Sequence, residues 1–354
     1  GRHHLSDEMR FGLIGAGAIG QIRANALARS PLCTLTAISD LDEARARSVG
    51  PNARFYQRAE ELIASADVDA VIISTPPPWH EPLAVAAAAA GKHVLVEKPM
   101  AATPASCERM VDAAKASGTL LTVGYNHRYF DALKLVRDTV SSGEIGSVSH
   151  VRAYSGHSGL AEFKAPWMYD KDVMGGGALM DNGTHMIDLV RYIIGDPVEV
   201  AGFATGKVWT LGVEDQGVAF LRTAAGTTAT IEASWHEWRG YRFHLEVYGD
   251  RGMAQAYYAP MMTKIIKMDR PGGRKTVSRR FFPQAILREK LQGWQSTVIQ
   301  TFVEELADFV ALARSEPHTG RLAGAVDGLR AVQIAHATYD SQSEKRFVRL
   351  PAPL

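Results

Sequence analysis

Short apolar runs and helix-like segments alternate along the first third of the chain. The runs that predict strands are 10–14, 35–39, 69–74 and 93–96. The segments with helical spacing of apolar residues are 19–29, 42–49, 59–64 and 82–90. Strands that alternate with helices predict an α/β fold with a doubly wound parallel sheet, whose ligand lies at the carboxyl ends of the strands.

The pattern changes in the second half of the chain, where β-prone runs dominate. The predicted strands are 147–154, 199–208, 217–223, 227–235, 243–249 and 262–268. The predicted helices are 131–141, 183–194, 298–313 and 322–339. We expect an α+β domain with a large, mainly antiparallel open sheet. The stretch 271–280 is rich in Gly, Arg and Lys, and we interpret it as an exposed loop.

A glycine-rich turn follows the first predicted strand and opens a helix. Its Gly-x-Gly-x-x-Gly pattern permits a tight turn, a close approach of the backbone to a pyrophosphate, and close helix packing. The helix N-terminus adds partial positive charge. An ordinary structural turn is the alternative, but the flanking strand and helix favour a dinucleotide site. The predicted cofactor-binding residues of the turn are Gly15, Gly17, Ala18, Ile19 and Gly20.

Asp40 ends the second predicted strand, 20 residues after Gly20. A carboxylate at this place accepts hydrogen bonds from the adenosine ribose and repels a 2′-phosphate. The sequence therefore favours NAD as the cofactor over NADP. Arg45 and Arg47 are the cations nearest in sequence; one alternative is that they reach the ribose, but we interpret them as part of a solvated helix face.

Length, charge and cysteine content narrow the class of protein. The chain has 354 residues, 46% of them hydrophobic, which is enough for two cores. Lys and Arg total 39 against 38 for Asp and Glu, and they are scattered, so we expect no nucleic-acid partner. We expect no membrane span, because no stretch reaches about 18 apolar residues. Cys33 and Cys107 have no Cys or His at ligand spacing, so we expect buried thiols, no metal and a cytoplasmic location.

Several further motifs follow the glycine turn in order. Thr-Pro at 75–76 and Glu-Lys-Pro at 97–99 close two predicted strands. Gly-Tyr-Asn-His-Arg-Tyr occupies 124–129 and Ser-Gly-Glu-Ile-Gly occupies 142–146. The longest motif, Gly-Gly-Gly-Ala-Leu-Met-Asp-Asn-Gly-Thr-His-Met-Ile-Asp, occupies 175–188. With these motifs the chain resembles, over nearly its whole length, the glucose-fructose oxidoreductase / inositol dehydrogenase / rhizopine catabolism (Gfo/Idh/MocA) family.

The resemblance implies a function and a domain order. Family members commonly oxidise or reduce sugars, inositols and related polyols, and their open sheets usually pair across subunits. We therefore expect an NAD-dependent dehydrogenase or reductase that moves a hydride between nicotinamide and a hydroxyl or keto carbon of a sugar, glycoside, amino sugar or cyclitol. We expect a homo-oligomer, a dimer or tetramer. The expected domains are an NAD-binding Rossmann domain at 9–128 and a substrate-binding and oligomerisation domain at 129–354, after a tail or cloning remnant at 1–8.

Three residues are candidates for the chemistry of oxidising a secondary alcohol, which needs a base for the hydroxyl proton. Lys98 follows a parallel strand, where the nicotinamide is expected, and the resemblance makes it the characteristic active-site residue, with a cis bond before Pro99. Asp181 and His185 share a helix face, so the carboxylate can orient a ring that titrates near neutral pH. A packed structural histidine and a metal ligand are the alternatives for His185. Asp188 is expected to support the helix or ring.

The remaining predicted site residues lie near strand ends or in the loop before the glycine run. For Asn126, Arg128 and His80, caps of local backbone are an equal alternative. The further cofactor-binding residues are Thr75, Pro76, His80, Glu97, Lys98 and Asn126. The predicted substrate-binding residues are Lys98, Arg128, Trp167, Tyr169, Asp181 and His185.

Two other functions are compatible with the fold: a glycoside hydrolase that retains NAD and oxidises its substrate transiently, and a non-catalytic sensor of NAD and a metabolite. The sequence around His185 is the one expected of dehydrogenases, and Lys98 and His185 are both present. We therefore favour the dehydrogenase. The substrate, the reacting carbon, the reaction direction, the exact oligomer and the choice of Lys98 or His185 as proton acceptor are open at this level.

Overall fold

The structure is a computed structural model that describes residues 7–163 and 165–353. Most of the predicted tail therefore lies outside the described residues. The chain forms two compact units, the first made of Gly1–Tyr129 with Leu291–Leu329 and the second of Phe130–Lys290 with Arg330–Leu354. The segment 291–329 was expected in the second domain and instead belongs to the first unit.

Helix α10 (Gln295–Ala313) is the reason for this difference. Its apolar face is buried in the core of the first unit, where Phe309 lies 5.6 Å, centroid to centroid, from Phe11 of strand β1. Burying two aromatic rings and their apolar neighbours stabilises the unit by several kcal/mol, about 1.5–3 kcal/mol for each large side chain. A helix far along the sequence thus completes the first core.

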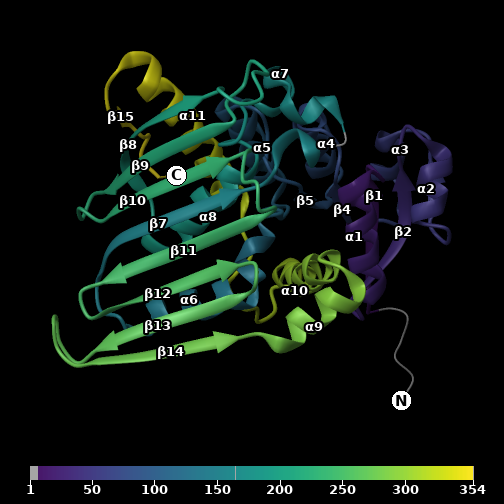
Figure 1. Ribbon diagram of the computed structural model, residues 1–354. Helices are drawn as coiled ribbons and strands as arrows, with labels where there is room; N and C mark the ends of the chain where they lie inside the picture. Colours follow the sequence, from purple (N-terminus) through teal and green to yellow (C-terminus); the bar gives the residue numbers. More distant parts are fainter. Residues whose placement is uncertain (1–6, 164, 354) are drawn as a thin grey trace. The chain divides into compact units, whose positions relative to one another are not determined.

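The first unit contains a six-stranded, wholly parallel sheet with the order β3-β2-β1-β4-β5-β6 (Figure 1). The strands are β1 (Met9–Ile14), β2 (Cys33–Ser39), β3 (Arg54–Tyr56), β4 (Ala70–Ile73), β5 (His93–Val96) and β6 (Leu121–Val123). The helices of this unit, with α10, are α1 (Ala18–Arg29), α2 (Glu43–Val49), α3 (Ala59–Ile63), α4 (His80–Ala89) and α5 (Pro104–Ser117), with short 3-10 turns η1 (Pro77–Trp79) and η2 (Asn126–Tyr129). The predicted doubly wound sheet is confirmed. Strand order reverses between β1 and β4, which makes their carboxyl ends the expected ligand position.

The second unit contains a nine-stranded sheet with the order β14-β13-β12-β11-β7-β10-β9-β8-β15. Every pairing is antiparallel except β7 with β10, so the predicted mainly antiparallel sheet is confirmed. The strands are β7 (Val148–Gly156), β8 (Pro197–Thr205), β9 (Gln216–Thr223), β10 (Thr228–Ser234), β11 (Arg242–Gly249), β12 (Gly252–Tyr258), β13 (Met262–Met268), β14 (Lys275–Phe281) and β15 (Val348–Arg349).

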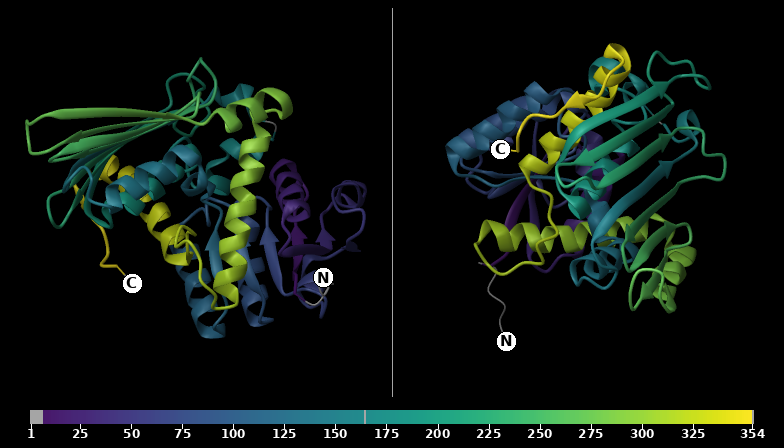
Figure 2. Two further views of the ribbon diagram at one scale, coloured as in Figure 1. Left: turned by 90° about the horizontal axis from the view of Figure 1, so that it is seen from below. Right: turned by 90° about the vertical axis from the view of Figure 1, so that its left-hand side faces the viewer.

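Helices cover one face of this sheet and leave the other face open (Figure 2). The covering helices are α6 (Asp131–Ser141), α8 (Asn182–Ile194) and α11 (Ala325–Glu344). Along the inner strands, buried and more exposed residues alternate, as a sheet with one packed face requires. The loop before α8 contains the short η3 (Gly159–Ala161), η4 (Pro166–Tyr169) and α7 (Lys171–Met174), and α9 (Pro283–Gln292) follows the sheet.

The prediction of a loop at 271–280 is wrong for the second half of that stretch, because strand β14 begins at Lys275. All seven residues of β14 are exposed, so its side chains have no apolar and polar alternation to reveal a strand. Its Lys and Arg residues are typical of a sheet edge, where charge discourages pairing with other chains. Strands β3, β6 and β12 and helices α5 and α9 were also missed.

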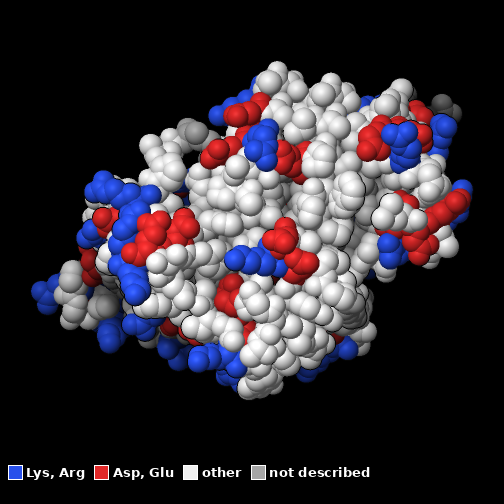
Figure 3. Space-filling view, turned by 90° about the horizontal axis from the view of Figure 1, so that it is seen from above, with Lys and Arg blue, Asp and Glu red and all other residues white. Residues whose placement is uncertain are grey.

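Among the described residues, no helix is long and apolar enough to cross a membrane. Acidic and basic side chains are interspersed on the face in Figure 3, without a continuous field of either sign. Both cysteines are buried, as expected, and burial raises the pKa of Cys33 to about 11.

Candidate active site

The glycine turn between β1 and α1 has the geometry that a dinucleotide requires. Gly15 has a φ of +94°, and a Cβ there would lie 2.7 Å from the carbonyl oxygen of Ser74. A Cβ on Gly20 would collide with the Gly15 carbonyl group. At Gly17, by contrast, a Cβ would meet nothing within 4 Å. This open approach, above a helix N-terminus without a side-chain cap, fits a pyrophosphate.

Asp40 lies beside the same turn. One carboxylate oxygen accepts a hydrogen bond from Ala16 N at 2.7 Å, and the other accepts from Asp42 N at 2.8 Å and from the Arg45 guanidinium at 2.6 Å. Partial burial raises the pKa of Asp40, but these hydrogen bonds outweigh it and hold the pKa below its ordinary value. The group is therefore anionic at neutral pH, as discrimination against a 2′-phosphate requires. Arg45 is exposed, as expected of a solvated helix face, and its guanidinium also pairs with this carboxylate.

His80 ties together the ends of β4 and β5. Its Nε2 lies 2.8 Å from the carbonyl oxygen of Thr75, and its Nδ1 lies 3.1 Å from the carbonyl oxygens of Pro99 and Met100. The imidazole is fully buried. The structure therefore gives His80 the backbone-fixing role that was one of its two interpretations. It holds the Thr75-Pro76 turn against the segment after Lys98.

Lys98 follows β5 and is half-buried, and its bond to Pro99 is cis, as the resemblance implied. Burial, together with the nearby Lys98 ammonium, lowers the pKa of His127 to about 3. His127 is therefore neutral over the working pH range. The Lys98 side chain therefore lies near an uncharged ring.

Glu97, next to Lys98, belongs to a buried ion cluster in the first unit. Arg23 of α1 donates to Glu97 through Nε and to Glu305 of α10 through a terminal nitrogen. Its guanidinium also lies 3.5 Å from the ring centroid of Phe302. All three charged groups are buried, so Glu97 holds the strand end that carries Lys98. Its predicted binding of the cofactor stays a prediction.

Asn126 and Arg128 are both buried in η2. Asn126 donates to the Thr301 hydroxyl at 2.9 Å. Arg128 donates to the carbonyl oxygen of Arg321 at 3.2 Å and lies 3.6 Å from Asp327. These contacts tie both residues to segments of the first unit that are distant in the sequence, not to local backbone. Their binding of cofactor or substrate stays a prediction.

In the second unit, Asp181 lies at the N-terminus of α8 with its carboxylate held by two donors. One oxygen lies 2.8 Å from His157 Nε2 and 3.1 Å from Trp235 Nε1. His157 follows β7 and Trp235 follows β10, the two parallel strands of this sheet. Sequence reasoning missed both partners. The available signal was a histidine directly after a strand, within Gly-His-Ser-Gly.

His185 and Asp188 lie on α8, and both are buried. The start of the helix is fixed by polar contacts, because Asn182 donates to the carbonyl oxygen of Ser155 at 2.7 Å and the Thr184 hydroxyl donates to that of Met180 at 3.1 Å. The helix therefore presents Asp181 and His185, one turn apart, from a rigid base. Asp181 itself is the N-cap residue with non-helical backbone angles (φ −80°, ψ −99°), so it lies just before the helix and not on the predicted helix face.

The two aromatic residues predicted to line the pocket, Trp167 and Tyr169, are half-buried in η4. Tyr169 packs against Phe163, which contacts Trp235 edge-on at 4.8 Å between ring centroids. This cluster thus backs one of the two donors to Asp181. Within the described ranges, no group of three His, Cys, Asp or Glu residues has the arrangement of a metal site.

The fold and these sites define a class of protein: an oxidoreductase with a Rossmann domain for NAD and a separate α+β domain. Residues 9–125 match the oxidoreductase family with an NAD-binding Rossmann fold, and residues 133–255 match the GFO/IDH/MocA C-terminal domain. The chain belongs to the GFO/IDH/MocA family and acts, as an NAD-dependent oxidoreductase, on CH–OH groups.

Curated relatives and solved structures agree with this assignment. The chain is 31% identical to a myo-inositol 2-dehydrogenase of Thermotoga maritima, over 97% of this chain and 98% of the relative. It is 29% identical to an inositol 2-dehydrogenase of Rhizobium meliloti, over 97% of this chain and 99% of the relative. A levoglucosan dehydrogenase solved with NADH shares the fold, with a TM-score of 0.85 at 23% identity, covering 97% of this chain and 99% of that one.

Proposed function

We propose that the protein is an NAD-dependent dehydrogenase of a cyclitol or sugar, oxidising one ring hydroxyl to a ketone. The observation that carries this proposal is the held carboxylate of Asp181, one helical turn before His185. The names of the relatives at 29–31% identity support a cyclitol as the first substrate class to test. The proposal rests on residue roles that the experiment below examines.

The proposed roles divide the work of alcohol oxidation. Bound NAD supplies the hydride acceptor. Lys98 donates a hydrogen bond to the reacting oxygen and stabilises the negative charge that develops as its proton leaves. His185 accepts that proton at its imidazole, and Asp181 orients the substrate and stabilises the imidazolium. Reduction of the ketone follows the same steps in reverse.

The test is NADH formation across a panel of inositols, aldoses, anhydro sugars, amino sugars and glycosides. We expect turnover of at least one cyclitol or sugar and its loss in Lys98→Ala and His185→Ala. Lys115→Ala and His318→Ala, which remove exposed residues of the same types, serve as matched controls. Unchanged rates in the two site variants contradict the assigned roles. Release of an aglycone without net NADH would identify the glycoside hydrolase instead.

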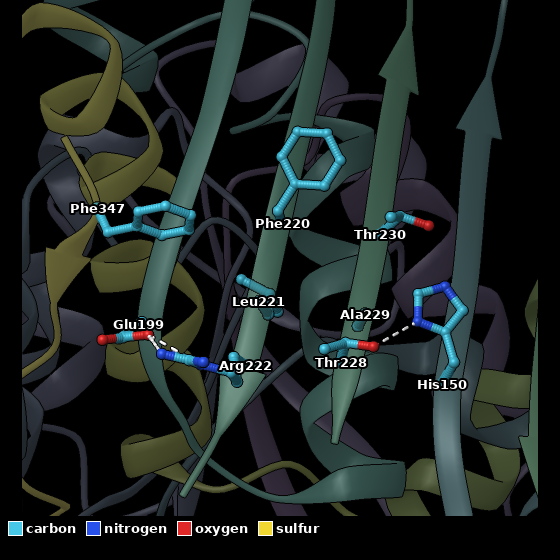
Figure 4. A pocket seen from close by; sticks show the side chains of 9 residues that line it. All are labelled: His150, Glu199, Phe220, Leu221, Arg222, Thr228, Ala229, Thr230 and Phe347. Atoms are coloured by element: carbon cyan, nitrogen blue, oxygen red, sulfur yellow. Dashed lines mark hydrogen bonds and ion pairs between the residues drawn. The ribbon is translucent and has the colours of Figure 1, made fainter. Parts of the chain in front are cut away.

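We also propose that the open sheet face pairs with the same face of a second copy. A pocket of about 490 Å³ lies on this sheet. Its lining side chains come from β7, β8, β9, β10 and the segment at Phe347 (Figure 4). Phe220 and Phe347 are 43% and 65% exposed there, beside the Glu199–Arg222 ion pair. Large exposed rings flanked by paired charges are typical of an interface between subunits.

A further inference from the structure

The glycine run before α8 lies against a single buried residue, Glu214. The carboxylate of Glu214 accepts hydrogen bonds from Gly177 N at 2.9 Å and from Leu179 N at 3.0 Å. Its own carbonyl oxygen accepts from Ala178 N at 3.0 Å. Three successive backbone N–H groups are therefore satisfied by one residue, which lies 37 positions further along the chain than Gly177.

The opposite ends of the same peptide groups hold the start of α8. The Gly177–Ala178 peptide donates to Glu214 through Ala178 N. Its carbonyl oxygen, that of Gly177, accepts a hydrogen bond from Asp181 N at 3.0 Å. The Ala178–Leu179 peptide donates to Glu214 through Leu179 N. Its carbonyl oxygen, that of Ala178, accepts a hydrogen bond from Gly183 N at 2.9 Å. Two consecutive peptide planes thus connect Glu214 directly to the backbone of Asp181 and to the first turn of the helix that carries His185.

Tyr339 of α11 fixes the carboxylate in this position. Its hydroxyl donates to the same oxygen of Glu214 that accepts from Leu179 N. A Cβ on Gly176 would collide with the Tyr339 hydroxyl, and a Cβ on Gly177 would collide with the Glu214 carbonyl group. The glycines are required here because the loop lies so close to these two residues. Burial raises the pKa of Glu214, although its three donors oppose this.

Asp181 is consequently held in two independent ways. Its side chain is bound by His157 and Trp235, and its main chain is bound through Gly177 to Glu214. A shift of the loop would displace Asp181 and His185 together, even though Glu214 and Tyr339 are not themselves among the residues assigned to the chemistry.

We propose that Glu214, locked by the Tyr339 hydroxyl, is a positioning residue that sets the catalytic geometry of Asp181 and His185. The inference rests on the proposed function, because it concerns the efficiency of that reaction. A misplacement on the order of 1 Å at a reacting group lowers turnover by roughly 100-fold, so a partly released loop reduces kcat rather than cofactor affinity.

The experiment compares Tyr339→Phe, Glu214→Gln and Glu214→Leu with wild type, using whichever panel substrate wild type oxidises. We expect kcat to fall about 10- to 100-fold in Glu214→Leu and less in the two conservative variants, which keep most of the hydrogen bonds. The dissociation constant for NADH, measured by fluorescence titration, stays at the wild-type value. The proposed function makes His185 the proton acceptor, so kcat/KM should fall at low pH as its imidazole becomes protonated. The pH of this fall, the His185 pH limb, shifts in the same variants.

Tyr257→Phe is the matched control, since it removes another tyrosine hydroxyl, 3.3 Å from Glu246, on strand β12 of the same unit. It keeps the wild-type kcat and pH profile. If Glu214→Leu does not fold, Tyr339→Phe decides, because it retains the ring and removes only the hydroxyl. A wild-type kcat and pH limb in the folded Glu214 and Tyr339 variants, with His185→Ala inactive, overturns the positioning role alone. No turnover by wild type on any panel member overturns the proposed function and this role with it.

Discussion

Replacing Arg23 with Met should destabilise the first unit strongly and in a pH-dependent way. The substitution keeps a chain of similar length but removes the only cation shown bonded to both Glu97 and Glu305 among the described residues. Removing one partner of a buried ion pair costs about 3–5 kcal/mol, because the remaining charge is left uncompensated. For a unit of this size, each kcal/mol lowers the melting temperature by roughly 2–4 °C, which gives a fall of about 6–20 °C.

The pH dependence follows from the carboxylates. Burial raises the pKa of Glu305 from 4.5 to about 7, while Arg23 partly offsets the rise. When folding raises the pKa of a carboxyl group, the folded state binds the proton more tightly than the unfolded state does. The resulting contribution to the free energy of unfolding is complete below the unfolded-state pKa and is lost as the pH rises through the folded-state pKa. Without Arg23 the folded-state pKa rises further. The melting temperature should therefore fall more, relative to wild type, at pH 8.5 than at pH 6.

Differential scanning calorimetry at the two pH values measures this prediction. Arg10→Met is the matched control, because Arg10 forms an ion pair with Asp69 at 2.8 Å on the same unit with both side chains about 40% exposed. Exposed pairs contribute only about 0–1 kcal/mol, so its melting temperature should change little. Adding Glu305→Leu to Arg23→Met should recover part of the loss. An Arg23→Met variant that melts like the control, or loses equal stability at both pH values, would refute the reasoning.

Four further results are expected. Asp40→Ser should raise kcat/KM with NADP relative to NAD by about 10-fold or more, since one charge interaction in this setting is worth a few kcal/mol, and adding Arg45→Ala should reverse part of the gain. His157→Ala should lower kcat by about 10- to 100-fold, because a hydrogen bond to the Asp181 carboxylate contributes about 1.5–3 kcal/mol. Exhaustive chelation should leave NADH formation unchanged; loss of activity restored by a divalent cation would contradict a metal-free reaction. Phe220→Lys should reduce the mass measured by light scattering to that of a 38.5 kDa monomer, and a monomeric wild type would contradict pairing through the sheet.

The parallel sheet could be predicted because its signals are local. The predicted strands β1, β2, β4 and β5 are short apolar runs that lead into helical segments, and the turn after β1 carries glycines at a recognisable spacing. Strand β14 lacked such a signal, whereas helix α10 was predicted at 298–313 but placed in the wrong unit. An exposed edge strand has no buried face to set a period of two, and nothing within the apolar face of α10 says which core it joins.

The candidate site divides in the same way. Asp40 and His185 could be predicted as candidates because Asp40 stands 20 residues after Gly20 and His185 lies within the motif at 175–188. His157 was missed because its contact with Asp181 spans 24 residues and depends on the parallel pairing of β7 with β10. Such a pairing depends on how the whole sheet is assembled, so short-range patterns cannot specify it.

The residues that hold the functional groups are indicated less clearly by the sequence. Their common feature is a charged side chain within a mainly apolar segment. Arg23 lies among the buried residues of α1, and Glu305 lies in the buried face of α10. A buried charge is costly unless a partner neutralises it, so each of these residues implies a partner elsewhere in the fold. The pair is separated by 282 residues, and the sequence indicates that a partner exists without identifying it. Since Arg23 binds the carboxylate next to Lys98, and Glu214 binds the loop before Asp181, substitutions at both should reduce turnover without touching substrate. Activity measurements on these holding residues therefore test how the site is positioned, whereas substitutions at Lys98 and His185 test which residues make up the site.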